Sequence, residues 1–218
     1  MTNRLTAFSP FKSYGKLTGL LALGLVALTL SGCATKPPPA NTHDDICKII
    51  EYDRNWYLAA QRSEEKWGTS VPILKAFVHQ ESRFVHNARP PRDFALGVIP
   101  LPRRSSAYGF AQAQNPAWYD YQKATKNYSA RRDNVYDALD FIGWYNSVSN
   151  SRNGISLGDP YNLYLAYHEG HGGYSRKTYN QKPWLLDVAK KVQRQAWSYE
   201  NQLKSCHVPK RMCLWPFC

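Results

Sequence analysis

One carboxylate is unusual for its place in the chain, in the segment AFVHQESRF at residues 76–84. Glu81 lies three, four and seven residues after Val78, Phe77 and Leu74, which puts it on the apolar face of a predicted helix. A carboxylate there is partly desolvated, and desolvation raises its pKa because the charged form is disfavoured. A raised pKa keeps a proton on the acid near neutral pH, as a general acid that protonates a leaving oxygen requires.

The alternative for Glu81 is a purely structural place at the edge of the apolar face, paired with Arg83 or a nearby Lys. Two later segments favour the chemical interpretation: SSAYGFAQAQNPAWY at 105–119 and YLAYHEGHGGY at 164–174. With the Glu-Ser pair at 81–82 they resemble, in this order, the motifs of the soluble lytic transglycosylase (SLT) catalytic domain of the goose-type lysozyme fold. That family has Glu-Ser at the end of a helix, then Ser-x-x-x-Gly-Leu-Met-Gln, and later Ala-Tyr-Asn-Ala-Gly.

The resemblance covers roughly residues 66–175 and implies a role for each matching position. Glu81 matches the catalytic acid/base of the family, and Tyr167 matches the Tyr that faces it. Gly109 and Gln112 match the central motif, which lines the cleft. The predicted substrate-binding residues are Ser82, Gln112 and Tyr167, which match family positions, and Tyr108, His168 and Glu169, which lie within or beside the same motifs without matching them.

The chain departs from the family pattern at three places. Phe110-Ala111 replaces Leu-Met, where an apolar Met would touch sugar, and His168-Glu169 replaces Asn-Ala. The 23 residues between Ser82 and Ser106 include a loop rich in Pro and Arg that is longer than a minimal family member needs. These differences bear on the substrate register and the product more than on the fold.

The resemblance implies a peptidoglycan lytic transglycosylase that uses one carboxylate and no cofactor, whereas most glycosidases use two carboxylates. Protonated Glu81 would donate to the oxygen of the β-1,4 bond between N-acetylmuramic acid and N-acetylglucosamine. As a base, it would then take the proton of the sugar's own 6-hydroxyl, which closes a 1,6-anhydro ring. This hydroxyl is favoured over water because it is intramolecular. The aromatic residues that would suit the faces of sugar rings, or else pack in the core, are Tyr108, Trp118, Tyr119 and Tyr167.

Glu169 adds a hypothesis about the product, because the family usually has a small residue at this position. If Glu169 faced the cleft, it could hold a water and shift some turnover towards hydrolysis. The interpretation that the sequence favours is a Glu at the C-terminal end of a helix, in solvent.

Helices must position these residues, and the apolar patterns predict a mainly α domain with little sign of strands. Start and stop signals define five helices, separated in one place by an irregular, basic loop. They run from Asp44 to about Lys66, from Thr69 or Ser70 to about Val85, from Asp133 or Asn134 to about Tyr145, from Asp159-Pro160 to near Gly170, and from Pro183 to Leu203, with the loop at 86–106. The expected fold is the lysozyme-like, goose-type helical domain of the SLT family, with a substrate cleft.

The N-terminal residues carry the pattern of a bacterial lipoprotein signal. Three cations and no acid precede an uncharged apolar run at 17–30, whose 14 residues are fewer than the roughly 20 that a spanning helix needs. Leu30-Ser31-Gly32-Cys33 then resembles a lipobox, which implies cleavage before Cys33 and its acylation; the alternative is an ordinary cleaved signal. Ala34 follows, so the family's sorting rule in a Gram-negative host predicts a lipid anchor on the periplasmic side of the outer membrane.

The number of the other cysteines is consistent with an exported protein. Without Cys33 their number is even, which in an exported protein indicates two disulfides with three possible connectivities. We expect Cys47–Cys206 and Cys213–Cys218, since the first pair would tie the first helix to the end of the last. A zinc site is disfavoured because paired C-x-x-C units are absent. The predicted organisation is a signal peptide at 1–32, an acylated Cys and Pro-rich tether at 33–43, a catalytic domain at 44–205 and a tail at 206–218.

Other functions stay open at this point. The signal carries three of the cations in the net charge of +12, so the mature chain keeps +9 and suits anionic surfaces such as peptidoglycan strands or lipid headgroups. A muramidase or a non-catalytic peptidoglycan-binding lipoprotein on the same fold fits this charge equally well. A metallohydrolase, and with it a metal site, is disfavoured because His168 and His171 stand at i and i+3 and glycines interrupt the helix. Nucleic-acid binding is disfavoured because an exported, acylated protein rarely meets nucleic acid.

Overall fold

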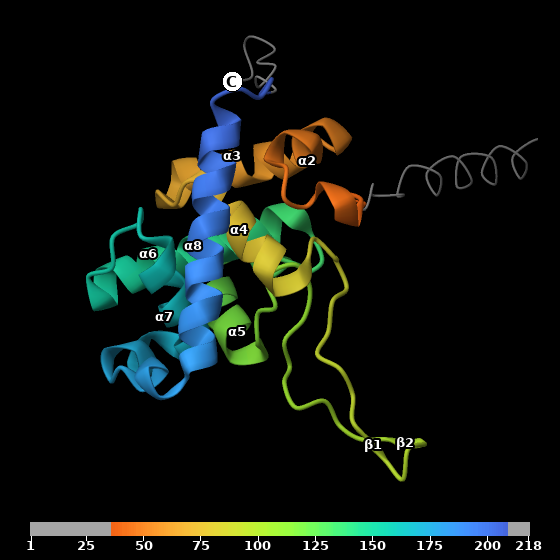
Figure 1. The fold of residues 1–218 in the computed structure, drawn as a ribbon. Helices are drawn as coiled ribbons and strands as arrows, with labels where there is room; N and C mark the ends of the chain where they lie inside the picture. Colours follow the sequence, from red (N-terminus) through yellow and green to blue (C-terminus); the bar gives the residue numbers. More distant parts are fainter. Residues whose placement is uncertain (1–35, 209–218) are drawn as a thin grey trace, which may run out of the picture. The chain divides into compact units, whose positions relative to one another are not determined.

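Helices make up most of the described chain, which in this computed structural model is residues 36–208 (Figure 1). The elements are η1 (Ala40–Thr42), α2 (Ile46–Tyr52), α3 (Asn55–Trp67), α4 (Val71–Ser82), β1 (Phe94–Ala95), β2 (Ile99–Pro100), α5 (Asn115–Thr125), α6 (Val135–Asn153), α7 (Pro160–Ser175), η2 (Thr178–Gln181) and α8 (Pro183–Leu203). Within residues 36–208, no helix is long and apolar enough to cross a membrane. The predictions for the signal peptide, Cys33, Cys213 and Cys218 lie outside the described residues.

By its backbone contacts the chain divides into Met1–Ala34 and Thr35–Cys218, and the hydrophobic core lies in the second unit. The core is built around α4, whose residues from Val71 to Val78 are all buried. The apolar face predicted for this helix therefore extends around it, as in a helix that neighbours enclose. Helices α3, α6 and α8 pack against α4, and in Figure 1 α8 crosses in front of it.

One of the buried residues of α4 is a lysine. Lys75 is 0% exposed, and its Nζ lies 4.2 Å from the ring centroid of Trp56 and 5.2 Å from that of Phe84. Burial holds the pKa of Lys75 well below its usual range, and the charge of Asp53 opposes this only in part. The aromatic faces thus take the place of water around the amino group of Lys75.

The first predicted helix is wrong in one respect, because it is two helices, α2 and α3. Asp45, and not Asp44, caps α2: its Oδ1 accepts from the backbone N–H groups two and three residues later, at 3.0 and 3.2 Å. The chain becomes extended at Asp53, whose Oδ1 accepts the N–H of Asn55 at 2.9 Å where α3 begins. Short polar side chains compete with the helix in this way, and the apolar period does not show it.

Two further elements differ from the sequence-based expectation. Helix α5 is not among the predicted helices, although Pro116 lies in its first turn and Trp118 and Tyr121 are buried on it. Helix α7 is interrupted at Gly170, as predicted, but a second helical segment then continues it to Ser175. Gly170 has φ 74° and ψ 157°, so the helix is kinked there.

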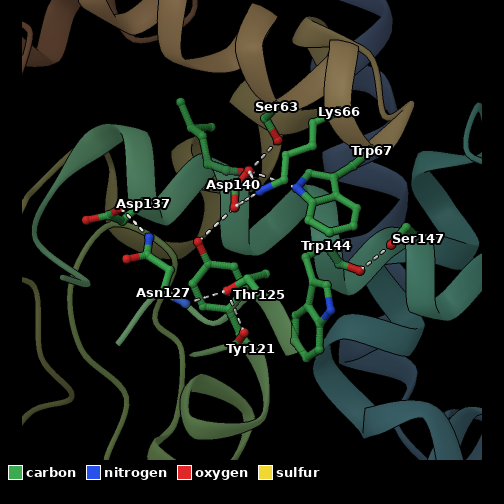
Figure 2. Close-up of polar contacts among 11 residues, drawn as sticks. Ser63, Lys66, Trp67, Tyr121, Thr125, Asn127, Asp137, Asp140, Trp144 and Ser147 are labelled. Carbon is green, nitrogen blue, oxygen red and sulfur yellow. Dashed lines mark hydrogen bonds and ion pairs between the residues drawn. The ribbon is translucent and has the colours of Figure 1, made fainter. Parts of the chain in front are cut away.

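The carboxylate of Asp140 fixes α6 against α3 and α5 (Figure 2). It accepts hydrogen bonds from Nζ of Lys66 at 2.9 Å, Nε1 of Trp67 at 2.8 Å and the hydroxyl of Tyr121 at 2.8 Å. A Cβ on Gly143 would lie 2.3 Å from a side-chain oxygen of α3, so the close approach of α3 and α6 requires glycine there. Helix α6 is thereby placed to form one wall of the groove described below.

The predicted disulfide between Cys47 and Cys206 is present and joins α2 to the chain just after α8, with the Cα atoms 5.4 Å apart. Gln202 reinforces this connection with two hydrogen bonds. Its Oε1 accepts the N–H of Ile46 at 2.9 Å, and its Nε2 donates to the carbonyl of Asp44 at 3.0 Å. The two ends of the domain are therefore held both covalently and by polar contacts.

The described end of the predicted tether packs on the domain. Pro38 and His43 are buried, and Nε2 of His43 lies 2.9 Å from the carbonyl oxygen of Pro38. The His43 ring lies 5.0 Å from that of Phe84, and the hydroxyl of Tyr199 donates to the carbonyl of His43. Residues 38–43, which the sequence assigns to the tether, thus contact the helical domain.

Candidate active site

Glu81 lies in the last turn of α4, beside two tyrosines of α7. The residue keeps some solvent exposure, but its carboxyl group is desolvated. Burial raises the pKa of Glu81 to about 7, and a hydrogen bond with the Tyr164 hydroxyl opposes the rise in part. Near neutral pH the carboxyl is therefore present in both protonation states, so that it can donate a proton and also accept one.

Aromatic rings of α4 and α7 pack against one another near this carboxyl. The ring of Phe77, one turn before Glu81, lies 5.4 Å from that of Tyr164 and 5.3 Å from that of Tyr167, both edge to face. The Tyr167 hydroxyl donates to the carbonyl of Ala111 at 2.6 Å. This bond ties α7 to the central motif and fixes the tyrosine next to Glu81.

Two tyrosines of α7 lie near Glu81, and the resemblance indicated one of them. Tyr167, which the resemblance places opposite Glu81, is close enough for the charge of Glu81 to raise its pKa. Tyr164, three residues earlier on the same helix face, forms a hydrogen bond with the Glu81 carboxyl. Burial and the charge of Glu81 raise the pKa of both tyrosines, so both hydroxyls stay protonated. The i, i+3 spacing of the two tyrosines is the sequence signal that would have found Tyr164.

The chain turns sharply directly after the Glu-Ser pair. Arg83 and Phe84 have φ of 49° and 62°, a left-handed conformation that is unfavourable for residues other than glycine. Burial of Phe84 holds it there: the side chain is 0% exposed and its ring lies 5.1 Å from that of Trp56. The hydroxyl of Ser82 donates to the carbonyl of Val78 at 3.2 Å, within its own helix.

The central motif is braced by Gly109 and Gln112. Gly109 has φ 79°, and a Cβ on it would lie 2.1 Å from the carbonyl oxygen of Arg132, so only glycine fits. Nε2 of Gln112 donates to the carbonyls of Ala88 and Gly109, at 2.9 and 2.8 Å. Gln112 thus lines the groove while its amide nitrogen holds the loop that follows α4.

Several of the residues expected at the cleft instead lie in the hydrophobic core or contact neighbouring polar side chains. Phe110-Ala111, expected to change the cleft floor, is 0% exposed and part of the core. The hydroxyl of Tyr108 donates to Asp133 at 3.4 Å, and the guanidinium of Arg89 lies over its ring at 4.5 Å. Trp118 is 4% exposed and packs in the core, which decides between its two interpretations.

A groove opens beside Tyr167. One hollow of about 280 Å³ is lined by α5, α6 and α7, and a neighbouring hollow of about 580 Å³ shares Ala117 and Tyr145 with it. Both volumes suit a ligand cleft. Among the predicted substrate-binding residues, the first hollow brings together Gln112, Tyr167, His168 and Glu169. Phe141 and Tyr145 also line it and had no signal in the sequence motifs.

The expectation that Glu169 lies in solvent is wrong. Its side chain is 3% exposed and accepts from Nζ of Lys182 at 2.7 Å, from the Thr178 hydroxyl and from Nδ1 of His168 at 3.2 Å. Burial alone would raise the pKa of Glu169, but these hydrogen bonds outweigh it and lower the pKa to about 2. The kink at Gly170 and the turn of η2 bring Lys182 to this carboxylate, which the sequence does not show.

The two histidines of HEGH have separate partners. His168 interacts with Glu169, whereas Nε2 of His171 lies 3.1 Å from Oγ of Ser149 and its ring stacks on Tyr145 at 4.4 Å. Within residues 36–208, no group of three or more His, Cys, Asp and Glu side chains could hold a metal ion.

Removing the Tyr164 hydroxyl tests its action on Glu81. In Tyr164→Phe, loss of a hydrogen bond that favours the ionised carboxylate is expected to raise the pKa of Glu81 further. A general acid works while protonated, so the fall of kcat/KM with rising pH, expected near pH 7 in the wild type, should move to higher pH. Tyr174→Phe is the control, because Tyr174 is also on α7 but donates to Asn162. An unchanged pH profile of kcat/KM in Tyr164→Phe would show that the Tyr164 hydroxyl does not lower the pKa of Glu81.

The comparison with known families agrees with this geometry. No curated protein matches the sequence. The family described as Transglycosylase SLT domain matches residues 21–206, which is most of the chain and includes α4, the central motif and α7. The mainly helical architecture is that expected of this lysozyme-like domain. The chain therefore belongs to the transglycosylase SLT domain family.

Proposed function

We propose that the protein is a peptidoglycan lytic transglycosylase that cleaves the β-1,4 bond between N-acetylmuramic acid and N-acetylglucosamine. Family membership supports the general part, a peptidoglycan-degrading enzyme of the lytic transglycosylase kind. The observation that supports cleavage by a single acid/base is the Glu81 carboxyl, which has a pKa of about 7 and lies beside Tyr164 and the groove residue Tyr167. A carboxyl in this state suits an acid that must also act as a base.

In the first step, protonated Glu81 donates to the glycosidic oxygen as the bond to the anomeric carbon breaks. The desolvated surroundings keep the proton on Glu81 until the leaving oxygen takes it. The Tyr164 hydroxyl then stabilises the carboxylate that remains, because its hydrogen bond favours the charged form. The groove along α5, α6 and α7 would hold the glycan strand in place for this transfer.

In the second step, the Glu81 carboxylate takes the proton of the sugar's 6-hydroxyl, whose oxygen closes the 1,6-anhydro ring. The hydrogen-bond partners of Glu169 support this outcome over hydrolysis. Glu169 is the one carboxylate among the residues that line the first hollow, and Lys182, Thr178 and His168 already occupy its oxygens. It is poorly placed to activate a water, so the intramolecular hydroxyl is favoured.

Digestion of purified peptidoglycan by residues 35–218, followed by mass spectrometry of the products, tests this function. Muropeptides with 1,6-anhydro ends are the expected result. Reducing ends alone would mean a muramidase on the same fold. A folded protein that releases no product but sediments with the peptidoglycan would be a binding module, and the proposed activity would be wrong.

A further inference from the structure

The loop after the active-site turn contains a feature that the proposed activity does not use. Within the segment 86–106, β1 and β2 form an antiparallel hairpin in which Phe94 pairs with Pro100 and Ala95 with Ile99. Figure 1 shows this hairpin standing away from the helices. We call residues 94–101 the hairpin tip.

The hairpin tip exposes apolar side chains next to one another. Single exposed apolar residues are common on soluble proteins, but neighbouring ones mark an interaction site. These side chains have no core to join, since both faces of the hairpin are largely open. The exposed fractions are 54% for Phe94, 90% for Leu96, 76% for Val98, 53% for Ile99 and 41% for Leu101.

Leu96 is also unusual for its backbone conformation, because it lies in the turn at the end of the hairpin. Leu96 and Gly97 have φ of 52° and 73°, and the N–H of Val98 donates to the carbonyl of Ala95 at 3.2 Å. Turns with positive φ at both central residues favour Asn, Asp or Gly. A Leu here is disfavoured by backbone conformation and by exposure to water, so neither folding nor solubility accounts for it.

Basic side chains lie behind the apolar tip. The segments on either side of it, 89–93 and 102–104, carry Arg89, Arg92, Arg103 and Arg104 against one acid, Asp93. Nε of Arg104 lies 2.6 Å from Oδ2 of Asp93, which places this guanidinium three residues from Leu96 along the hairpin. At about 3.3 Å per residue, that is roughly 10 Å behind the tip. Amphipathic elements bury their apolar side to about this depth below lipid headgroups.

We propose that the hairpin tip inserts into the surface of an anionic lipid bilayer, with the arginines behind it at the level of the headgroups. The positive charge of the hairpin complements anionic headgroups. A protein partner fits less well, because a stable protein interface covers about 800 Å² on each side and the tip is only eight residues long. This contact is separate from the glycan groove and from any lipid on Cys33, and would hold the domain close to a membrane.

Vesicle flotation with residues 35–218 tests the proposal, since these residues contain the whole hydrophobic core. We expect flotation with vesicles that contain phosphatidylglycerol, and less with vesicles of phosphatidylcholine alone. Leu96→Ser combined with Val98→Ser should weaken binding to both kinds of vesicle, by about a hundredfold. Arg92→Gln and Arg104→Gln should each weaken binding to the anionic vesicles by about fivefold and reduce its dependence on salt.

Matched controls lie elsewhere on the surface. Tyr128→Ser removes a side chain from a residue that is 71% exposed, and Arg62→Gln removes an exposed charge from α3; neither should change flotation. Circular dichroism would show that each variant is folded. The proposal is wrong if folded wild type does not float, or if the Leu96 and Val98 changes leave flotation unaltered. It is also wrong if these changes weaken binding to purified peptidoglycan and not to vesicles, because the tip would then contact the glycan.

Discussion

Glu81→Gln is expected to reduce the release of anhydro-muropeptides by about 10³- to 10⁴-fold, the upper part of the range for general acid–base catalysis. The loss should be large because the proposed mechanism uses this carboxyl in both steps. Gln has nearly the same shape, and its amide oxygen can still accept from the Tyr164 hydroxyl, but it has no proton of the right acidity to donate. Initial rates on purified peptidoglycan, with products identified by mass spectrometry, would measure the effect.

The stability of Glu81→Gln separates lost chemistry from lost folding. Because the folded state raises the pKa of Glu81 to about 7, the wild type loses stability as pH rises from the unfolded pKa towards and through pH 7. Gln carries no charge, so above pH 7 the variant should unfold at a temperature at least as high as the wild type. Glu51→Gln, an exposed change on α2, is the control and should keep full activity. Retained activity in Glu81→Gln would exclude Glu81 as the acid/base.

Removal of the Cys47–Cys206 disulfide should give the largest loss of stability. The two cysteines are 159 residues apart in the sequence, and closing so long a loop restricts the unfolded chain strongly. Cys47→Ser combined with Cys206→Ser should lower the free energy of unfolding by about 4 kcal/mol. For a domain of this size that corresponds to a fall in Tm of roughly 8 to 16 °C. Urea and thermal unfolding under oxidising conditions would measure both quantities.

Activity and reductant provide the checks on this prediction. The proposed acid/base, Glu81, is on α4 and the tyrosines beside it are on α7, whereas the disulfide joins α2 to the chain after α8. The double variant should therefore keep its activity at temperatures well below its Tm. Reductant should destabilise the wild type by a similar amount and have little effect on the variant. If the variant unfolded like the wild type, the polar contacts of Gln202 with Asp44 and Ile46 would be sufficient to join α2 to α8.

Most helices could be predicted because their signals are local. Asn134 caps α6 through two backbone N–H groups and Asp159 caps α7 ahead of Pro160, as the sequence indicated, and α3 ends at Trp67, next to the expected Lys66. The apolar face of α8 also lies in the core as expected. These features depend on residues within one or two turns of each other, and a sequence shows them directly.

The candidate site was predicted less completely, because its contacts join distant segments. The motifs led to Glu81, and the groove contains the predicted Gln112, Tyr167 and His168. The hydrogen bond from Tyr164 depends on how α7 is rotated against α4, which the motif alone does not specify. Tyr108 lies next to the central motif, but its hydroxyl donates to Asp133 and its ring packs against the guanidinium of Arg89.

The sequence by itself determined the helical class, the order of the motifs, the family resemblance and the identity of the carboxylate that falls on an apolar face. Only the tertiary structure decided the state of each carboxylate. Glu81 has a pKa of about 7 because packed helices remove water from it, whereas Glu169 has a pKa of about 2 because Lys182, 13 residues away, donates to it. Both are glutamates near the end of a predicted helix. The apolar face of its helix predicts desolvation for Glu81, but the sequence does not show that Glu169 is also buried and that Lys182 pairs with it. That difference depends on the surroundings in three dimensions, because charge stability is set by neighbouring atoms and not by neighbours in the chain.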